Sequence, residues 1–354
     1  MVKWISTTIL LLTFSAQAQE VREFYNGIRA MGMGGAAIAV VNDETALLYN
    51  PAALGKLRDS YGTIFDPEAI GSEANANILQ NKLFGNPFSL KDVKDATDIT
   101  REKPYLTKAQ IFPSYVLRNF GIGIYAKYEL AAEMNAGGTA MQTFYEEDIA
   151  AVLGYNLRLF DGRVKIGASA KYLTRIQIDR ALDPTGSLAV KDHATEGAAL
   201  ATDAGLILTA PWKLLPTLSV VARDIGNTKF TAGKNVRMTT TDRPPEIEAD
   251  YDVALALFPI HSNSSRSTFT LEYSNVLKSA DYTNKYRFYH VGYEWNFSDL
   301  LFVRAGMNGK YWTAGLELAS EHTQIQLVSY GEEIGTSDVP REDRRYGFKF
   351  AIRF

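Results

Sequence analysis

YGFKFAIRF (346–354) ends the chain, and its side chains alternate strictly between two kinds. Successive side chains of a β-strand point to opposite faces, so the stretch predicts a strand with one apolar face and one small or cationic face. A soluble protein would turn the apolar face toward its core. A membrane β-barrel would turn it toward lipid and the other face toward the lumen. The apolar face consists of Tyr346, Phe348, Phe350, Ile352 and Phe354, and the other of Gly347, Lys349, Ala351 and Arg353.

The N-terminus indicates export. Residues 1–18 combine Lys3, an apolar run and Ala16-Gln17-Ala18, which predicts a secretory signal peptide cleaved after Ala18. Later segments lack the ~18 consecutive apolar residues of a transmembrane helix. The chain has no cysteine, so it offers neither a disulfide nor a thiolate metal site. Its charges are interspersed and sum to -3, which gives no reason to expect nucleic-acid binding. An exported chain of this kind is periplasmic, secreted or a β-barrel.

Long alternating strands favour the barrel. In 163–179, isoleucines and alanines share one face while lysines, Arg175 and Asp179 share the other. Strands of globular proteins have about 5–6 residues, whereas tilted membrane-spanning strands need about 9–11. We therefore predict an all-β, antiparallel transmembrane β-barrel of about fourteen strands. The predicted strands are 60–66, 107–117, 120–134, 145–157, 163–180, 199–210, 216–228, 247–258, 266–276, 285–296, 300–308, 311–319, 322–331 and 343–354.

The connections between these strands alternate in length. Those after even-numbered strands are short, such as "RNFG" and "NFSD", and most of those after odd-numbered strands are longer, such as 67–106 and 181–198. Outer-membrane barrels have short periplasmic turns and long extracellular loops. The pattern therefore predicts an outer-membrane location, with the last strand pairing with the first. A terminal aromatic residue on such a strand also resembles the signal that the barrel-assembly machinery reads.

Residues 19–58 differ from the strands because they are rich in glycine and alanine and partly helical in pattern. Asn42 or Asp43 is a candidate cap for a short helix through Tyr49. Asn50 before Pro51 suits a helix cap followed by proline at the first position. "GMGGAA" (32–37) matches the dinucleotide fingerprint in form, but no strand precedes it in a βαβ unit, so close backbone packing explains its glycines better. We expect this segment to pack inside another structure.

The sequence offers little for catalysis or metal binding. The four histidines, His193, His261, His290 and His322, show no metal-ligand spacing. No G-x-S-x-G motif is present, and a single strand histidine such as His290 is more often structural than catalytic. We predict no enzyme activity, no metal and no cofactor.

Charged residues alternate with apolar ones and are predicted to face the lumen. Both signs occur, so they either line a water-filled pore or form an internal ion-pair network that holds the wall and the N-terminal segment; we favour the network. They are Lys127, Glu129, Glu133, Lys165, Lys171, Arg175, Arg223, Glu272, Glu294, Arg304, Glu317, Lys349 and Arg353.

The long connection 67–106 is unusually apolar for a loop outside the cell. Two interpretations remain open: a lid that packs on the barrel rim, or a capture surface for a hydrophobic ligand or a partner. Its apolar residues are Ile78, Leu79, Leu83, Phe84, Phe88, Leu90 and Val93.

"GIRAMGMGGAAIAVVNDETALLYNPAALG" (27–55) resembles the FadL/TodX superfamily of outer-membrane transport proteins, including its PorV-like branch. "VARDIGN" (221–227) resembles a strand end of the PorV-like branch more weakly. The resemblance implies a fourteen-stranded barrel whose N-terminal segment folds into the lumen as a hatch. It also implies domains at 1–18 (signal peptide), 19–58 (hatch) and 59–354 (outer-membrane barrel). The implied hatch residues are Gly32, Gly34, Gly35, Asn50, Pro51 and Ala52.

The resemblance implies two alternative functions. In the FadL branch, fatty acids or hydrocarbons bind near the extracellular end and leave through an opening in the wall, without a cofactor. The PorV-like branch serves protein secretion or surface assembly by binding secretion-system proteins. We expect passive uptake of small hydrophobic molecules as the first function and secretion as the alternative, with outer-membrane lipid and the barrel-assembly machinery as partners in both.

Overall fold

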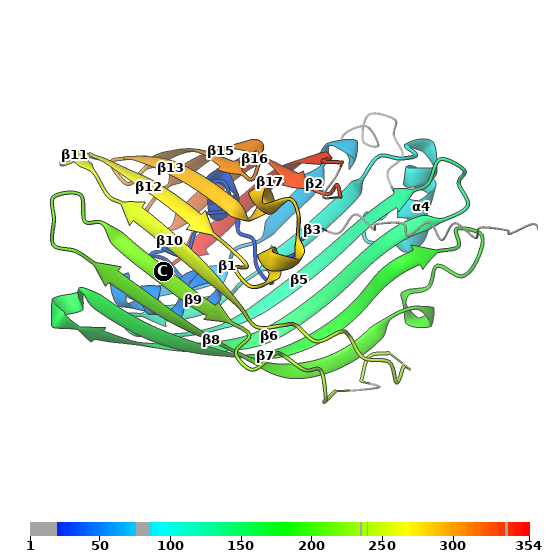
Figure 1. The fold of residues 1–354 in the computed structure, drawn as a ribbon, viewed down its shortest axis with the longest axis horizontal. Helices are drawn as coiled ribbons and strands as arrows, with labels where there is room; N and C mark the ends of the chain where they lie inside the picture. Colours follow the sequence, from blue (N-terminus) through cyan, green and yellow to red (C-terminus); the bar gives the residue numbers. More distant parts are fainter. Residues whose placement is uncertain (1–19, 76–84, 234–235, 239, 337–338) are drawn as a thin grey trace, which may run out of the picture.

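The computed structural model describes residues 20–354 apart from 76–84, 234–235, 239 and 337–338. These residues form a closed antiparallel β-barrel (Figure 1). The wall has fourteen strands, because β1 and β2 are halves of one wall strand, β3 and β4 are halves of the next, and β11 only extends a hairpin with β12. The predicted fold class is confirmed. The predicted signal peptide, 1–18, lies outside the described residues.

Most wall strands lie within a few residues of their predicted bounds. They are β1 (Tyr61–Phe65), β2 (Glu68–Ser72), β3 (Tyr105–Ile111), β4 (Ser114–Leu117), β5 (Phe120–Met134), β6 (Met141–Leu159), β7 (Val164–Leu182), β8 (Thr195–Thr209), β9 (Thr217–Arg223), β10 (Asp250–Leu257), β11 (Ile260–Ser262), β12 (Ser265–Tyr273), β13 (Tyr289–Phe297), β14 (Leu301–Asn308), β15 (Tyr311–Ala319), β16 (Thr323–Glu333) and β17 (Glu342–Arg353). The helices are α1 (Ile28–Gly32), α2 (Ala46–Tyr49) and α4 (Leu90–Ile99), with 3-10 turns η1 (Pro51–Lys56), η2 (Phe160–Gly162), η3 (Val190–Asp192), η4 (Lys278–Asp281) and η5 (Lys285–Phe288).

The last strand closes the barrel with the faces that its alternation predicts. β17 pairs with β16 on one side and with β1 and β2 on the other. Tyr346 and Phe348 point outward and are 51% and 45% exposed, whereas Gly347 and Lys349 are buried toward the lumen. Exposed apolar side chains continue around the other strands, among them Ile124, Leu153 and Val303. The outer face is therefore an apolar band of the kind that contacts lipid.

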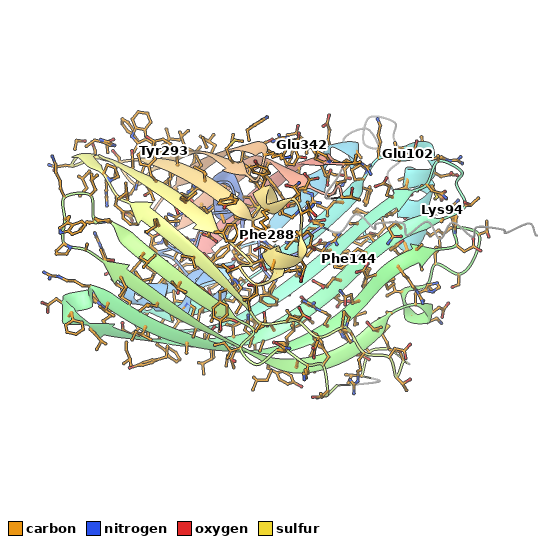
Figure 2. The ribbon with its side chains drawn as sticks, viewed as in Figure 1. Lys94, Glu102, Phe144, Phe288, Tyr293 and Glu342 are labelled. Carbon is orange, nitrogen blue, oxygen red and sulfur yellow. The ribbon has the colours of Figure 1, made fainter. Side chains whose placement is uncertain are left out.

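The wall is uneven in height. β6 and β7 each have 19 residues and reach far into the long-loop end, at the right of Figure 1, while β9 and β10 are short. In Figure 2, Lys94 and Glu102 lie at that end, whereas Phe288 and Phe144 lie nearer the middle of the barrel. No helix among the described residues is long and apolar enough to cross a membrane.

The connection 67–106 is more ordered than its sequence suggests, because it contains β2 and α4. Leu90 and Val93 of α4 pack on the outward-facing Leu130 and Met134 of β5. This helix therefore packs on the outer face of the wall instead of on the rim of the barrel. Ile78, Leu79, Leu83 and Phe84 lie outside the described residues.

Candidate functional site

Residues 20–58, called the N-terminal segment below, lie inside the barrel (blue in Figure 1). α1, α2 and η1 have only five, four and six residues, and Pro51 prevents α2 from continuing into η1. The start of η1 is as predicted: the Asn50 side chain accepts a hydrogen bond from the Ala52 N–H (3.0 Å), and Pro51 is the first helical residue. α2 instead begins at Ala46 after Thr45, whose side chain does not cap it, and Asp43 accepts from the Thr45 N–H (3.0 Å) in the turn before the helix.

The glycines of the segment lie against the wall. Gly34 has φ +70°, a conformation that favours glycine. Its N–H donates to the Thr313 hydroxyl (3.0 Å), and its carbonyl oxygen lies 2.7 Å from Nδ1 of His290. The Gly32 carbonyl accepts from Thr313 (3.1 Å), while Gly35, also at positive φ, donates back to α1. His290 therefore holds backbone in the lumen, which agrees with a structural role.

Asn50, Pro51 and Ala52 contact the opposite part of the wall. The Asn50 amide, which is fully buried, donates to the Ile38 carbonyl and to the Ser219 hydroxyl, both at 2.8 Å. Pro51 lies against Gly167, where a Cβ atom would collide with its backbone. The Ala52 carbonyl accepts from Asn156 (3.0 Å), and Gly205 makes room for the Asn50 amide. The six residues that the resemblance singles out thus all lie in the lumen.

A guanidinium of the segment joins it to the ion pairs of the wall. Arg29 binds both carboxylate oxygens of Glu294, at 3.1 and 2.9 Å, and lies 3.1 Å from Asp43 within the segment. Glu294 also accepts from Arg304 (2.7 Å), which binds Glu317 in turn. Removing one partner of such a buried pair leaves an uncompensated charge, which costs about 3–5 kcal/mol. The network therefore fixes where the segment lies in the lumen.

A second set of ion pairs holds the start of the segment. Glu20 binds Arg345 of β17 at 2.7 and 3.0 Å and also pairs with Arg22 at 3.0 Å. Arg22 reaches Glu129 of β5 (3.2 Å). Burial alone would raise the pKa of Glu20, but Arg22 and Arg345 outweigh it and lower this pKa to about 2. Glu20 is therefore charged at every physiological pH.

Lys56 differs from these charges because it contacts no carboxylate among the described residues. Its ammonium donates to the Ala39 carbonyl and lies 5.6 Å from the centre of the Phe258 ring. Burial, with the nearby positive charges of Lys165 and Arg29, lowers the pKa of Lys56 to about 7.

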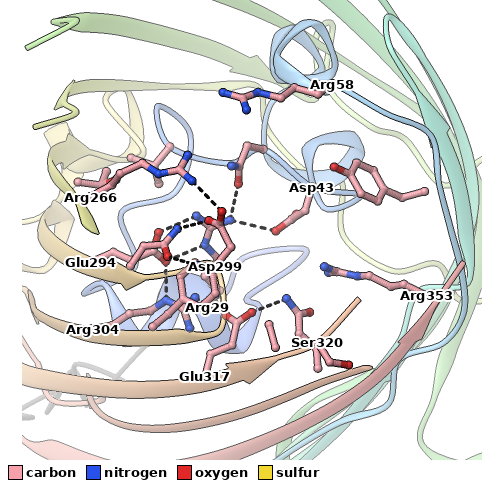
Figure 3. Close-up of a pocket in the computed structure, with 18 of the residues that line it drawn as sticks. Arg29, Asp43, Arg58, Arg266, Glu294, Asp299, Arg304, Glu317, Ser320 and Arg353 are labelled. Carbon is pink, nitrogen blue, oxygen red and sulfur yellow. Dashed lines mark hydrogen bonds and ion pairs between the residues drawn. The ribbon is translucent and has the colours of Figure 1, made fainter. Parts of the chain in front are cut away.

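A polar cavity of about 650 Å³ lies between the N-terminal segment and the end of the barrel that carries the short turns. Figure 3 shows its lining, with Arg29 joined to Asp43 and Glu294. Arg266 and Asp299 pair on its rim at 2.7 Å. Cations and anions alternate around this cavity, so its lining favours water over an apolar molecule.

Two smaller cavities continue this space through the segment. One, of about 20 Å³, shares Arg29, Asp43 and Arg353 with the large cavity. The other, of about 60 Å³, shares Tyr25 and Tyr49 with the first. A cavity of 10–15 Å³ is enough for one water molecule. Each small cavity has room for at least one water molecule, and the Tyr25 and Tyr49 rings line both of them.

The tyrosines are fixed in place. Their ring centroids lie 5.0 Å apart, a favourable aromatic distance. The Tyr25 hydroxyl donates to Glu68 (2.9 Å), and the Tyr49 hydroxyl accepts from the Gly27 N–H (2.7 Å). The two rings thus pack against each other beside both small cavities, a role that the sequence did not predict for them.

The hydrogen-bond ladder between the first two wall strands is interrupted. β1 and β4 pair up to Thr63 opposite Ser114, and β2 and β3 resume at Glu68 opposite Gln110. The hydroxyls of Thr63 and Ser114 are buried without a partner at this point. The wall therefore lacks backbone pairing between these two strands at this point.

Prolines cause the interruption. Pro67 and Pro113 lie in adjacent strands and have no N–H to donate, which confines proline to edges and irregular places of a sheet. Across the interruption, the Asp66 carboxylate accepts a hydrogen bond from the Phe112 N–H (2.7 Å). The Phe112 ring turns into the lumen, over Gly123, where a Cβ would lie 2.6 Å from it. Gly123 makes room for this ring.

The charges predicted to face the lumen are mostly found there and mostly paired. Lys127 contacts Glu146 and Asp148, Arg175 binds Asp148, and Glu272 accepts from the Ala37 and Ile38 N–H groups at 2.7 and 3.0 Å. The network interpretation is therefore the better one. Glu133 alternates as predicted but pairs with Arg341 of a loop. No group of histidine, aspartate and glutamate suited to a metal ion occurs among the described residues.

No protein-family model matches the chain, and no curated protein matches its sequence. Solved structures do match its fold. The monoaromatic hydrocarbon channel CymD has a TM-score of 0.57 at 10% identity, over 93% of this chain and 97% of CymD. This chain has the FadL/TodX fold. The toluene transporter TbuX of Ralstonia pickettii has a TM-score of 0.55 at 11% identity, over 93% and 98% of the two chains. The toluene transporter TodX of Pseudomonas putida has a TM-score of 0.53 at 11% identity, over 95% and 98%. The FadL/TodX fold therefore extends over nearly the whole chain.

Proposed function

We propose that this chain is an outer-membrane channel for passive uptake of small hydrophobic molecules of the hydrocarbon or fatty-acid type, and that residues 19–58 are its hatch. The observation that carries the proposal is an N-terminal segment that fills the lumen and is anchored on opposite parts of the wall, through Thr313, Glu294 and Ser219. The fold that it shares with CymD, TbuX and TodX supports it. Residues 1–18 would be the cleaved signal peptide and 59–354 the barrel. The process needs no catalysis and no cofactor.

A hydrophobic molecule has little reason to cross the charged cavity at the short-turn end. The interruption between the first two wall strands offers a shorter way, because it lies within the apolar outer band. We propose that molecules entering from the long-loop end leave sideways at Asp66-Pro67 and Phe112-Pro113. Opening this exit would require the Asp66 bond to Phe112 to break and the buried Phe112 ring to move.

Deletion of residues 27–55 tests the hatch. The ion pairs and hydrogen bonds that hold the segment are then absent, so uptake of a radiolabelled hydrocarbon or fatty acid by intact cells should change and leakage of small solutes should rise. An Arg29→Gln variant, which removes the ion pairs to Glu294 and Asp43 but leaves the segment in the chain, provides a milder comparison. If uptake and leakage both equal those of the wild type in cells with the same amount of folded barrel, residues 27–55 are not a hatch.

The alternative is a barrel that serves protein secretion or surface assembly. Two exposed aromatic side chains favour it, Phe160 (75% exposed) and Trp212 (70%), at the tips of neighbouring short turns. Such residues suit either the membrane interface or a protein partner. Affinity purification from gentle detergent extracts distinguishes the two: a stoichiometric partner lost in Trp212→Ala supports secretion, and the absence of any partner supports the channel.

A further inference from the structure

A cavity of about 420 Å³ lies outside the barrel, between α4 and the outer face of β2 and β3. Its floor is made of outward-facing residues, since the intervening Ile70 and Lys108 point into the lumen, toward Ile28 and Glu129. These floor residues are Ala69, Gly71, Thr107 and Ala109.

Large side chains border this floor at the same height. Ala69 pairs with Phe348 of β17, and Ala109 pairs with Tyr128 of β5. Side chains at paired positions share a face, so the small floor lies as a groove between two aromatic ridges. Phe348 is 45% exposed and belongs to the apolar outer band. The groove is therefore continuous with the surface that faces lipid.

α4 forms a fixed roof over the groove. Val93 and Ala96 point down from it and are 1% and 6% exposed. Phe88 packs edge-on against Tyr128 with ring centroids 4.6 Å apart, and the Tyr128 hydroxyl donates to the Phe88 carbonyl (2.9 Å). Ser89 caps the helix by accepting from the Asp92 N–H (3.4 Å). The roof is thus held on the wall without filling the space beneath it.

We infer that this groove binds one acyl chain of a membrane lipid. Ligand sites of about 300–1,000 Å³ have mostly apolar walls with few polar groups, and here the polar groups, such as Asn86 and Asp92, belong to the loop and roof. The paired strands β2 and β3 separate the groove from the lumen, so an occupant comes from the membrane. The inference rests on the membrane location in the proposed function but not on transport. A chain in the groove would lie beside the wall interruption.

Photo-crosslinking tests this inference. The purified barrel in nanodiscs is given a phosphatidylethanolamine that carries a diazirine near the end of one acyl chain, irradiated, digested and analysed by mass spectrometry. We expect the crosslinks to concentrate on peptides from 85–97 and 105–111. Ala109→Phe should reduce them about fivefold, because a phenyl ring excludes the chain from a close-packed space. Ala69→Leu, at an exposed position of the same floor, should act in the same direction.

Ala151→Phe is the matched control. It also faces outward, opposite Ile124, but lies away from the groove, so it should leave the crosslinks unchanged. Crosslinks spread uniformly around the whole outer face would overturn the inference, because nonspecific contact with lipid produces that pattern. Crosslinks concentrated on lumen residues such as Phe112 would overturn it as well. If Ala109→Phe or Ala69→Leu does not fold, the distribution of crosslinked peptides in the wild-type barrel is sufficient to support or reject the inference. Labelling of the groove in a protein that takes up no hydrocarbon would leave the inference standing and reject the transport proposal.

Discussion

Asn50 shows how a single side chain fixes the N-terminal segment. Its amide is fully buried and bonds to Ile38, Ala52 and Ser219, so it joins two turns of the segment to each other and to β9. A buried polar group costs free energy when its partner is lost, and the loss exceeds the net value of the bond itself.

Asn50→Ala should therefore loosen the segment. It leaves the Ala52 N–H without its partner, while the Ile38 carbonyl keeps only the Ser219 hydroxyl (3.1 Å). We expect a loss of about 1–3 kcal/mol of unfolding free energy. Denaturant titration in detergent micelles, together with protease protection of the segment, measures the loss. Asn135→Ala loses hydrogen bonds only within its own exposed loop, so it should leave the protease protection of the segment at the wild-type level and cost less stability. Equal stability of the Asn50 and Asn135 variants would show that the amide does not anchor the segment.

Lys56 makes docking of the segment depend on pH. Its pKa is about 7 when buried, against an ordinary value of 10.5, because burial and the nearby Lys165 and Arg29 disfavour the charge. Between these two values the undocked segment binds more protons than the docked one, so docking strengthens as pH rises from about 7 to 10.5. Below pH 7 the full cost of burying the charge remains.

Protease protection of the segment should therefore be greater at pH 9.5 than at pH 6.5. Lys56→Met removes the titrating group and should flatten this difference, while the exposed Lys191→Met keeps it. A wild-type segment that is equally protected at both pH values would contradict the prediction.

At the scale of elements, the alternation of apolar and polar residues predicted the wall strands well. Membrane-spanning strands are long, and the polarity of each side chain indicates whether it faces lipid or the lumen. The strand interruptions were not predicted. The first strand was expected to end at residue 66, before Pro67, and the second to run without a break from 107 to 117, through Pro113. Those two prolines were the available signal. The small-residue content of 19–58 predicted a packed segment. Which wall residue each part of it contacts depends on three-dimensional distances across the barrel, so Thr313, Glu294 and Ser219 were not predictable as partners.

The tyrosine pair gives the N-terminal segment a constriction that can be tested. Tyr49→Ala removes one wall between the two small cavities, so small-ion conductance in planar bilayers should rise severalfold over wild type. Tyr49→Phe keeps the ring and should conduct like wild type. If the alanine and phenylalanine variants conduct equally little, the barrier to ions lies elsewhere in the segment.

At the scale of the whole molecule, the barrel combines two surfaces that a hydrophobic molecule would treat differently. The short-turn end of the lumen is lined by paired charges, and the outer wall is an apolar band. The FadL/TodX fold accommodates both because strand alternation separates them. The wall interruption is where the lumen and the apolar band come closest without a hydrogen-bond ladder between them.

Restoring that ladder should close the proposed exit. In Pro67→Val/Pro113→Val both residues regain an N–H and suit a strand, so the first two wall strands can pair across the gap between Thr63 and Glu68. We expect uptake of a labelled hydrocarbon to fall severalfold while the heat resistance of the folded barrel stays equal or rises. Pro211→Val, in an exposed short turn, should leave uptake unchanged. Wild-type uptake by the double variant would mean that molecules leave by another way, through the lumen past the N-terminal segment, and in that case Tyr49→Ala should raise uptake as well as conductance.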